Sequence, residues 1–453
     1  MSERVAPDRS TRRLLLTLGL GVFAAALDLN VLSPALPVLA RSFGVVTGDL
    51  AWIFTLYLLV NVAAIAIAGT LADRYGRRRI YQLSIGIFAL GSAVTVLAPN
   101  YDYFLFGRAL LALGAGGIFP VATAAVGDVV PPSRRGAALG TIAATWGLAA
   151  IAGPAIGGVV THFFSWPWIF APNFPLAAVV LWLSRTYVPI KAPRTRGPID
   201  ALGLFLLCCG LLAVVDAILS VRADVGGIGV VSLTAFFLRE RRSRDPILPF
   251  SLLRSGQLWK TYLLEITIGV LEGSLFFIPA VIVSAQHVST AIAGGVAALG
   301  ALIFVAVIPF SGRALDRVGS RDVLFAGCFF TEIGLAIFAL GFDSMPLTVV
   351  AMIVSGVGFG ALLGAPTRYI VTNETGASTR ATAVGLLSQA LIIGQIIGTA
   401  LVGSIIGNLR SEAAGYRFAY LTASTIALLA LFITSTLRGR TSERAVPLEE
   451  AAP

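Results

Sequence analysis

Charged residues are scarce in this sequence. Asp, Glu, Lys and Arg make up 12% of its 453 residues, whereas apolar side chains make up 57%. That proportion leaves too little charge to cover the surface of a soluble protein. Apolar runs of about 20 residues, a length that crosses a hydrocarbon core of ~30 Å, follow one another along most of the chain. The sequence therefore predicts an all-α polytopic membrane protein with no separate soluble domain.

Cysteine and histidine are also rare, and the motifs of several enzyme classes are missing. The three cysteines, Cys208, Cys209 and Cys328, all lie in apolar runs, at spacings that suggest neither a metal site nor disulfides. The sequence contains no zinc-binding HExxH motif, no nucleophile elbow and no glycine-rich phosphate loop. We therefore expect no catalytic residue, no metal and no cofactor, which argues against a membrane enzyme and against an ATP-driven pump.

What the sequence does contain is a series of apolar runs separated by short polar segments. We predict fourteen transmembrane helices, at 14–38, 50–71, 80–98, 104–126, 136–160, 168–188, 200–220, 225–238, 259–284, 291–311, 322–341, 346–370, 380–407 and 416–437. The eighth is short, so twelve spans with two helices lying on or dipping into the membrane are the alternative.

The basic residues are distributed unevenly between the predicted loops. With the N-terminus placed in the cytoplasm, all but five of the 33 Lys and Arg residues fall on the cytoplasmic side. This asymmetry predicts that both termini are cytoplasmic and that the membrane is the cytoplasmic (inner) membrane. It also accounts for the net charge of +10 without a nucleic-acid partner.

An internal repeat divides the chain. The charged segment Gly69–Arg79 is repeated with fewer matching residues at Gly312–Arg321, and a similar offset along the sequence aligns Asp28 with Glu272. We therefore predict two parallel six-helix bundles with two extra helices inserted between them. The predicted boundaries are a cytoplasmic tail at 1–13, an N-terminal bundle at 14–190, a linker with the two inserted helices at 191–255, a C-terminal bundle at 256–437 and a cytoplasmic tail at 438–453.

Several carboxylates lie inside apolar runs. A charged side chain at the bilayer centre costs about 2.5–3.5 kcal/mol on insertion scales, so each of them needs a reason. We predict that Asp28, Glu265 and Glu272 couple transport to protons; the two glutamates share one helix face because they are seven residues apart. The alternative for Asp28 is a purely structural pair with a fixed cation such as Arg108. Glu332 has no repeat partner and is predicted to hydrogen-bond to another helix.

The segment Gly69–Arg79 suggests more than an orientation signal. Gly69 and Gly76 would permit a tight turn, and Asp73 is out of place in a purely basic anchor. Asp73 therefore needs a partner. We expect the helix N-terminus near Arg380 to supply it, because free backbone amides attract an anion.

With these residues collected, the chain resembles the major facilitator superfamily over essentially its full length, and within it the fourteen-span drug:proton antiporters. The resemblance is carried by the signature loop Gly69–Arg79, the antiporter motif Gly153-Pro154-x-x-Gly157-Gly158, and the segment Trp166–Phe170 followed by Asn173 and Pro175. The sequence departs from the family pattern in the fourth span, which keeps Arg108 but has Leu111 and Ala112 where Gln and Gly are usual.

The resemblance implies roles for these residues. It implies a gating loop made of Gly69, Asp73, Arg74, Gly76 and Arg77, with Asp316 and Arg317 as counterparts in the second half. It implies exchange rather than uptake for the antiporter motif. It also implies a central cavity, whose lining we expect to include Asp28, Asn30, Tyr57, Arg108, Glu265 and Glu272.

Together these features predict a proton-driven, monomeric exporter of small lipophilic cations that works by alternating access, with membrane lipids as its surroundings. A lipid or fatty-acid exporter of the same fold is the alternative, because an apolar cavity suits both. A solute uptake symporter fits less well because of Gly153 and Pro154. A membrane sensor that does not transport would need no titratable pair and would usually carry a larger soluble extension.

Overall fold

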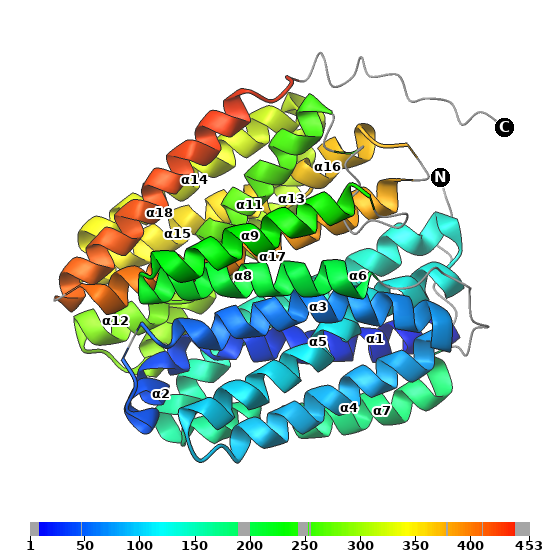
Figure 1. Ribbon diagram of the computed structural model, residues 1–453, viewed down its shortest axis with the longest axis horizontal. Coiled ribbons are helices and arrows are strands. Elements are labelled where there is room, and N and C mark those ends of the chain that lie inside the picture. Colours follow the sequence, from blue (N-terminus) through cyan, green and yellow to red (C-terminus); the bar gives the residue numbers. More distant parts are fainter. Residues whose placement is uncertain are drawn as a thin grey trace. The chain divides into compact units, whose positions relative to one another are not determined.

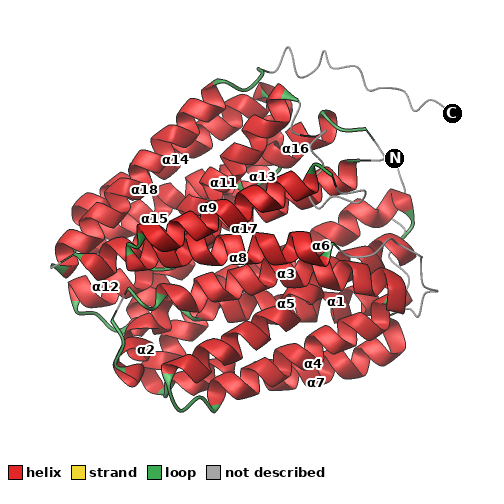
Figure 2. Cartoon of the chain, in the orientation of Figure 1, coloured by secondary structure: helices red, strands yellow, loops and turns green. Residues whose placement is uncertain are grey.

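The computed structural model describes residues 9–46, 48–188, 200–242, 252, 255–376, 379–409 and 411–439. Within these ranges every regular element is helical and no strand occurs (Figure 2). The chain divides into two compact units. Unit 1 consists of Met1–Leu32 with Val60–Ile199, and unit 2 of Ser33–Leu59 with Asp200–Pro453.

Unit 1 is built mainly from long helices (Figure 1), and the residues of α3 before Val60 are assigned to unit 2. Its elements are α1 (Arg9–Val31), α3 (Ala51–Tyr75), α4 (Arg77–Val96), α5 (Tyr101–Val129), α6 (Pro132–Phe163), the 3-10 helix η2 (Trp166–Phe170) and α7 (Asn173–Tyr187).

Unit 2 holds the remaining described helices, including the two that follow the first half of the chain. Its elements are η1 (Ser33–Ala35), α2 (Leu36–Phe43), α8 (Ala201–Ser220), α9 (Ala223–Glu240), α11 (Gly256–Leu275), α12 (Ile278–Gln286), α13 (Thr290–Val318), α14 (Ser320–Gly341), α15 (Met345–Leu362), α16 (Pro366–Asn373), α17 (Arg380–Asn408) and α18 (Glu412–Ser435).

The same helix pairings occur in both units. In unit 1, α1 packs against α6 and α7, and α4 packs against α5 and α7. In unit 2, α11 packs against α17 and α18, and α14 packs against α15 and α18. These pairs correspond under the sequence repeat, so the repeat in the sequence is matched by a repeat in packing.

Each predicted span has a helical counterpart, but four of them are interrupted near a proline. The first span breaks at Pro34 and Pro37, the sixth at Pro172, the ninth just before Pro279 and the twelfth just before Pro366. Proline lacks a backbone N–H and clashes with the preceding turn, so it is tolerated where a new helix begins and ends an old one. In α5 and α6, by contrast, Pro120 and Pro154 lie inside continuous helices.

By length and composition, thirteen helical stretches in the described residues can cross a membrane. The predicted eighth span, α9, is not among them. It has three charged residues, Asp224, Arg239 and Glu240, near its two ends. The uncharged stretch between them rises about 21 Å at 1.5 Å per residue, less than the ~30 Å core. The fourteen-span arrangement therefore stays a prediction.

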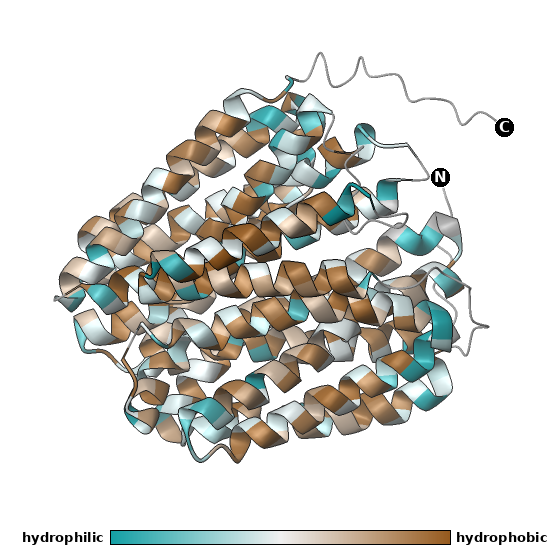
Figure 3. Ribbon diagram, viewed as in Figure 1, coloured by the Kyte–Doolittle hydropathy of each residue, from teal (hydrophilic) through white to brown (hydrophobic). Residues whose placement is uncertain are grey.

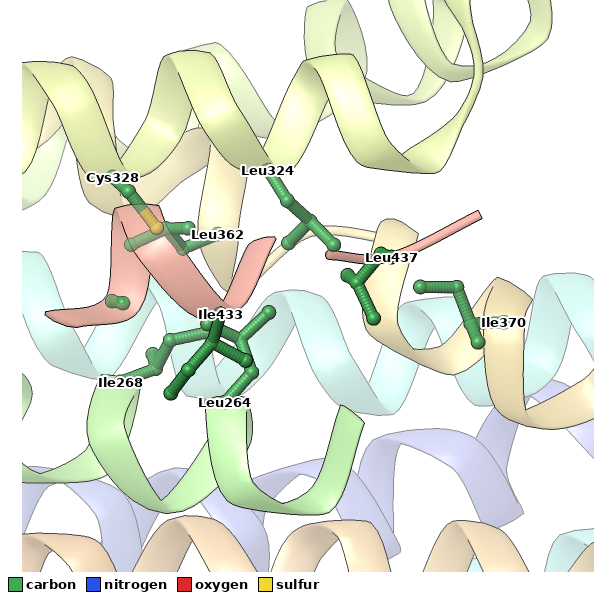
Figure 4. Close-up of a cluster of buried hydrophobic side chains, with 9 residues drawn as sticks. Leu264, Ile268, Leu324, Cys328, Leu362, Ile370, Ile433 and Leu437 are labelled. Carbon is green, nitrogen blue, oxygen red and sulfur yellow. The ribbon is translucent and has the colours of Figure 1, made fainter. Parts of the chain in front are cut away.

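Hydropathy follows the predicted pattern, since the helices are apolar over most of their length and hydrophilic residues gather towards their ends (Figure 3). In unit 2, one buried cluster joins Leu264 and Ile268 of α11 to side chains of α14, α15, α16 and α18 (Figure 4). Because these two side chains occupy the apolar face of α11, Glu265 and Glu272 fall on a neighbouring face of the same helix.

Candidate functional site

Asp28 and Arg108 form a buried ion pair in unit 1. Asp28 lies in the C-terminal part of α1, and Arg108 lies two turns into α5. Arg108 Nη1 is 2.5 Å from Asp28 Oδ2, and both side chains are fully shielded from solvent. The pair that the sequence offered as the structural alternative for Asp28 is therefore present. Opposite charges favour each other strongly in such surroundings, because little water screens them.

The second oxygen of Asp28 is also bonded. Asn173, the first residue of α7, donates its Nδ2 to Asp28 Oδ1 at 3.2 Å and to Ser92 Oγ of α4 at 3.0 Å. Asn173 and Ser92 are both buried. Sequence reasoning used Asn173 only as part of a family pattern and did not place it at the site. Four helices thus bring one polar side chain each to the same buried spot.

The antiporter motif packs against the helix of Asp28. A Cβ atom placed on Gly153 would lie 2.4 Å from Asn30 Cβ, so only glycine permits this approach between α6 and α1. Asn30 is half-buried and donates its amide to the Ala26 carbonyl of its own helix at 2.8 Å. Gly157 accepts a hydrogen bond from Thr161 within α6. The motif therefore determines how closely α1 and α6 approach each other at Asn30, two residues after Asp28.

Glu265 and Glu272 lie on one face of α11 in unit 2, as their spacing predicts. Thr367 and Gln395 hydrogen-bond to Glu265 and Glu272 respectively, and Arg368 lies close enough to Glu265 to attract it. In the described residues, Oε2 of each glutamate is buried without a hydrogen-bond partner. In the part of the chain that the structure describes, neither glutamate has an ion pair like that of Asp28.

The remaining residue expected in the cavity, Tyr57, is 3% exposed and lies in the part of α3 that belongs to unit 2. The structure therefore groups Asp28, Asn30 and Arg108 within unit 1, and Tyr57, Glu265 and Glu272 within unit 2. That these residues line one cavity stays a prediction.

The signature loop is a single residue between two helices. Helix α3 continues to Tyr75 and α4 starts at Arg77, so only Gly76, with φ of 95°, makes the turn. The expectation that Gly69 shares in this turn is wrong, because Gly69 lies inside α3. Polar residues at a membrane edge are compatible with helix, and the hydropathy pattern placed the end of this helix too early.

Charged side chains meet on either side of this turn. Asp73 and Arg77 form a salt bridge, and Arg77 Nε is 3.3 Å from Asp128 Oδ2 at the end of α5. Asp128 was missed by sequence reasoning, since an acid at the end of a span resembles an ordinary interfacial residue. Arg74 is exposed and lies over the ring of Tyr75. The predicted contact of Asp73 with the helix starting near Arg380 would join the two units and stays a prediction.

The echo of this loop in unit 2 has the same turn but different surroundings. Gly319, with φ of 94°, separates α13 from α14 in the way Gly76 separates α3 from α4. Asp316 and Arg317 are exposed, whereas Asp73 is buried. At the position equivalent to Arg77 the chain has Ser320, which carries no charge. The repeat therefore preserves the turn without preserving the buried charges.

Glu332 of α14 accepts a hydrogen bond from Ser424 of α18 at 3.2 Å. The prediction that this acid bonds to another helix is confirmed. No group of three or more His, Cys, Asp or Glu side chains in the described residues is arranged to hold a metal ion.

An all-helical membrane protein with two repeated units and buried intramembrane charges has the architecture of a secondary transporter. The family model described as Major Facilitator Superfamily matches residues 18–399 and, in a second match, 262–453. The chain therefore belongs to the Major Facilitator Superfamily and is a multi-pass membrane transporter.

Related proteins differ in what their names say they carry. The chain is 31% identical over 420 residues to the uncharacterized MFS-type transporter YfiU of Bacillus subtilis, covering 88% of this chain and 81% of that one. It is 28% identical over 426 residues to a multidrug resistance protein B homolog of Mycobacterium tuberculosis, with coverage of 88% and 77%. It is 27% identical over 362 residues to the riboflavin transporter RibZ of Clostridioides difficile, with coverage of 77% and 78%.

Solved structures support the same fold. The crystal structure of a D-xylose-proton symporter matches with a TM-score of 0.71 at 14% sequence identity, covering 95% of this chain and 99% of the symporter. At that level of identity the likeness shows the fold and does not extend to the substrate.

Proposed function

We propose that this transporter is a proton-coupled exporter of small lipophilic cations, of the fourteen-span drug:proton antiporter type, with both termini in the cytoplasm. The observation that carries the proposal is the set of three intramembrane carboxylates distributed over the two repeated units, of which Asp28 and Glu265 are buried and Glu272 is half-buried. Buried acids in apolar surroundings suit both proton exchange and the binding of a lipophilic cation, whose charge they balance when they lose a proton.

The proposed mechanism is a competition between substrate and protons. Substrate arriving from the cytoplasm displaces protons from Asp28 and Glu272, with Glu265 as a relay, and the acids are protonated again from outside. Each inward proton yields ~2.3 kcal/mol per 100 mV of membrane potential, which supports a roughly fifty-fold concentration gradient. The two bundles would tilt to expose the site to each side in turn.

Two observations favour export over uptake. The antiporter motif at Gly153 and Pro154 is built into the contact between α6 and the helix that carries Asp28. Relatives that match more than three quarters of this chain include multidrug resistance proteins. The signature loop with Asp73 and Arg77 would latch the cytoplasmic gate between the two states.

The test measures proton release on addition of substrate. Purified protein in weakly buffered detergent solution should release protons when ethidium, a lipophilic cation, is added. Asp28→Asn and Glu272→Gln should each reduce that release, whereas Asp102→Asn, at an exposed acid in the first turn of α5, should leave it unchanged. Unchanged release in both buried variants would remove these acids from the mechanism. Proton release with oleate in place of ethidium would favour the fatty-acid exporter.

A further inference from the structure

The carboxamide of Asn173 is held by a side chain that fixes its orientation. Ser92 Oγ donates to the Phe88 carbonyl at 3.1 Å, so towards Asn173 the hydroxyl oxygen acts as an acceptor. The group facing Ser92 must then be the NH2 of Asn173, which is also the group that faces Asp28. A carboxamide NH2 has two hydrogens, and this arrangement uses one for each partner.

Asn173 is therefore a donor to Asp28, and it favours the charged form of the carboxylate. Arg108 holds the other oxygen, Oδ2, through a shorter and charge-assisted bond. Both oxygens of Asp28 thus face donors. Each oxygen keeps a second lone pair that can take a proton, and protonation weakens both contacts because a neutral carboxyl group is a poorer acceptor than a carboxylate.

The two contacts differ in strength. The bond from Arg108 joins opposite charges, whereas the donor of the bond from Asn173 is neutral. A proton on Oδ1 leaves Oδ2 as a carbonyl acceptor for the charged Arg108. Oδ1 is thus the oxygen that accepts the proton, and the contact with the neutral amide of Asn173 is the one that loosens.

We propose that Asn173 is a positioning residue that holds Asp28 in its charged, Arg108-paired geometry and is displaced when Oδ1 is protonated. Because Asn173 begins α7 and its amide also holds Ser92 of α4, its displacement loosens a polar contact between α4 and α7. This inference rests on the proposed proton coupling at Asp28. It adds Asn173 as the residue through which protonation of Asp28 changes the contact between α4 and α7.

Other charged groups of unit 1 do not share this spot. Besides Arg108, the titratable or charged side chains of the described helices packed around Asp28 lie nearer the helix ends. They are Arg12 and Arg13 on α1, Arg77, Arg78, Arg79 and Tyr81 on α4, Tyr101, Asp102, Tyr103 and Asp128 on α5, Arg134, Arg135 and His162 on α6, and Arg185 and Tyr187 on α7. The protonation state of Asp28 in this unit is therefore governed locally by Arg108 and Asn173.

The test follows protonation of Asp28 directly, by infrared difference spectroscopy of the purified protein as a function of pH. The carbonyl band of protonated Asp28 is assigned by its absence from the Asp28→Asn/Arg108→Gln double variant, which removes both charges together. In Asn173→Ala the band should appear at a pH higher than in the parent by about one to two units, as expected for loss of one hydrogen bond to a charged group. Asn61→Ala, at a half-buried amide of α3, is the matched control and should titrate like the parent.

Ser92→Ala provides a second route to the same result. It removes the acceptor that orients the amide, and it should move the titration in the same direction by a smaller amount, even if Asn173→Ala does not fold. An unchanged titration in a folded Asn173→Ala variant, or in Ser92→Ala, overturns the inference. Because the infrared readout needs no substrate, it is independent of the ethidium experiment, and a failure of the proposed function is distinguishable from a failure of this inference.

Discussion

Asp28 and Glu272 occupy matching places in the first helix of each half, yet they have different surroundings. Asp28 accepts a hydrogen bond from a guanidinium on one carboxylate oxygen and from a carboxamide on the other. Glu272 has an amide, Gln395, and a buried Oε2 with no hydrogen-bond partner in the described residues. The repeat thus conserves the position of an acid in the fold, while the neighbouring helices decide what each acid contacts.

The largest expected difference is in stability. Asp28→Asn takes the anion away from a fully buried guanidinium and should cost about 3–5 kcal/mol of unfolding free energy. Glu272 has no ion-pair partner in the described residues, and Glu272→Gln keeps the shape of the side chain, so that free energy should change by less than about 1 kcal/mol. Denaturant unfolding in detergent measures both. The Asp28→Asn/Arg108→Gln double variant should recover much of the loss, and equal costs for the two single variants would contradict the comparison.

The two signature loops give a second contrast, in turnover. Asp73→Asn breaks a buried salt bridge with Arg77 and should lower the transport rate about tenfold or more while sparing substrate binding. Asp316→Asn, at the exposed equivalent position in unit 2, should change the rate less than twofold. Ethidium transport into inverted vesicles and ethidium binding to purified protein give the two readouts. An unchanged transport rate in Asp73→Asn would mean that the loop serves only to orient the protein in the membrane.

These contrasts separate what the sequence could predict from what it could not. Charges inside apolar runs are conspicuous in any sequence, so Asp28, Arg108 and both glutamates could be found, and the Asp28–Arg108 pair could be anticipated. The hydrogen bonds from Asn173 to Asp28 and from Arg77 to Asp128 depend on how each helix is rotated about its axis, which one sequence does not determine. The proline breaks and the helical position of Gly69 were missed because hydropathy records burial in the membrane and not backbone geometry.

A smaller effect is expected at the contact between α1 and α6. Gly153→Ala places a methyl group 2.4 Å from Asn30 Cβ and should destabilise the protein by about 1–3 kcal/mol through overpacking. Gly140→Ala, in the same helix, meets no atom within 4 Å and should stabilise the helix by up to about 1 kcal/mol. A lower unfolding temperature for Gly153→Ala and a higher one for Gly140→Ala would show that Gly153 is needed for the close approach of α1 and α6. Higher unfolding temperatures for both variants would show that the two helices can move apart at little cost.

The smallest effect is expected at the acid that has no repeat partner. Glu332 accepts a hydrogen bond from Ser424 and has no role in the proposed proton path. Glu332→Gln keeps an acceptor for that hydroxyl, so unfolding free energy should change by less than about 1 kcal/mol and proton release on ethidium addition should not change. The same measurement on Glu272→Gln should show reduced release. If proton release falls in both Glu332→Gln and Glu272→Gln, position in the repeat does not distinguish a proton-carrying acid from a structural one. Every buried carboxylate in the spans then has to be compared with Asp28 and Glu272.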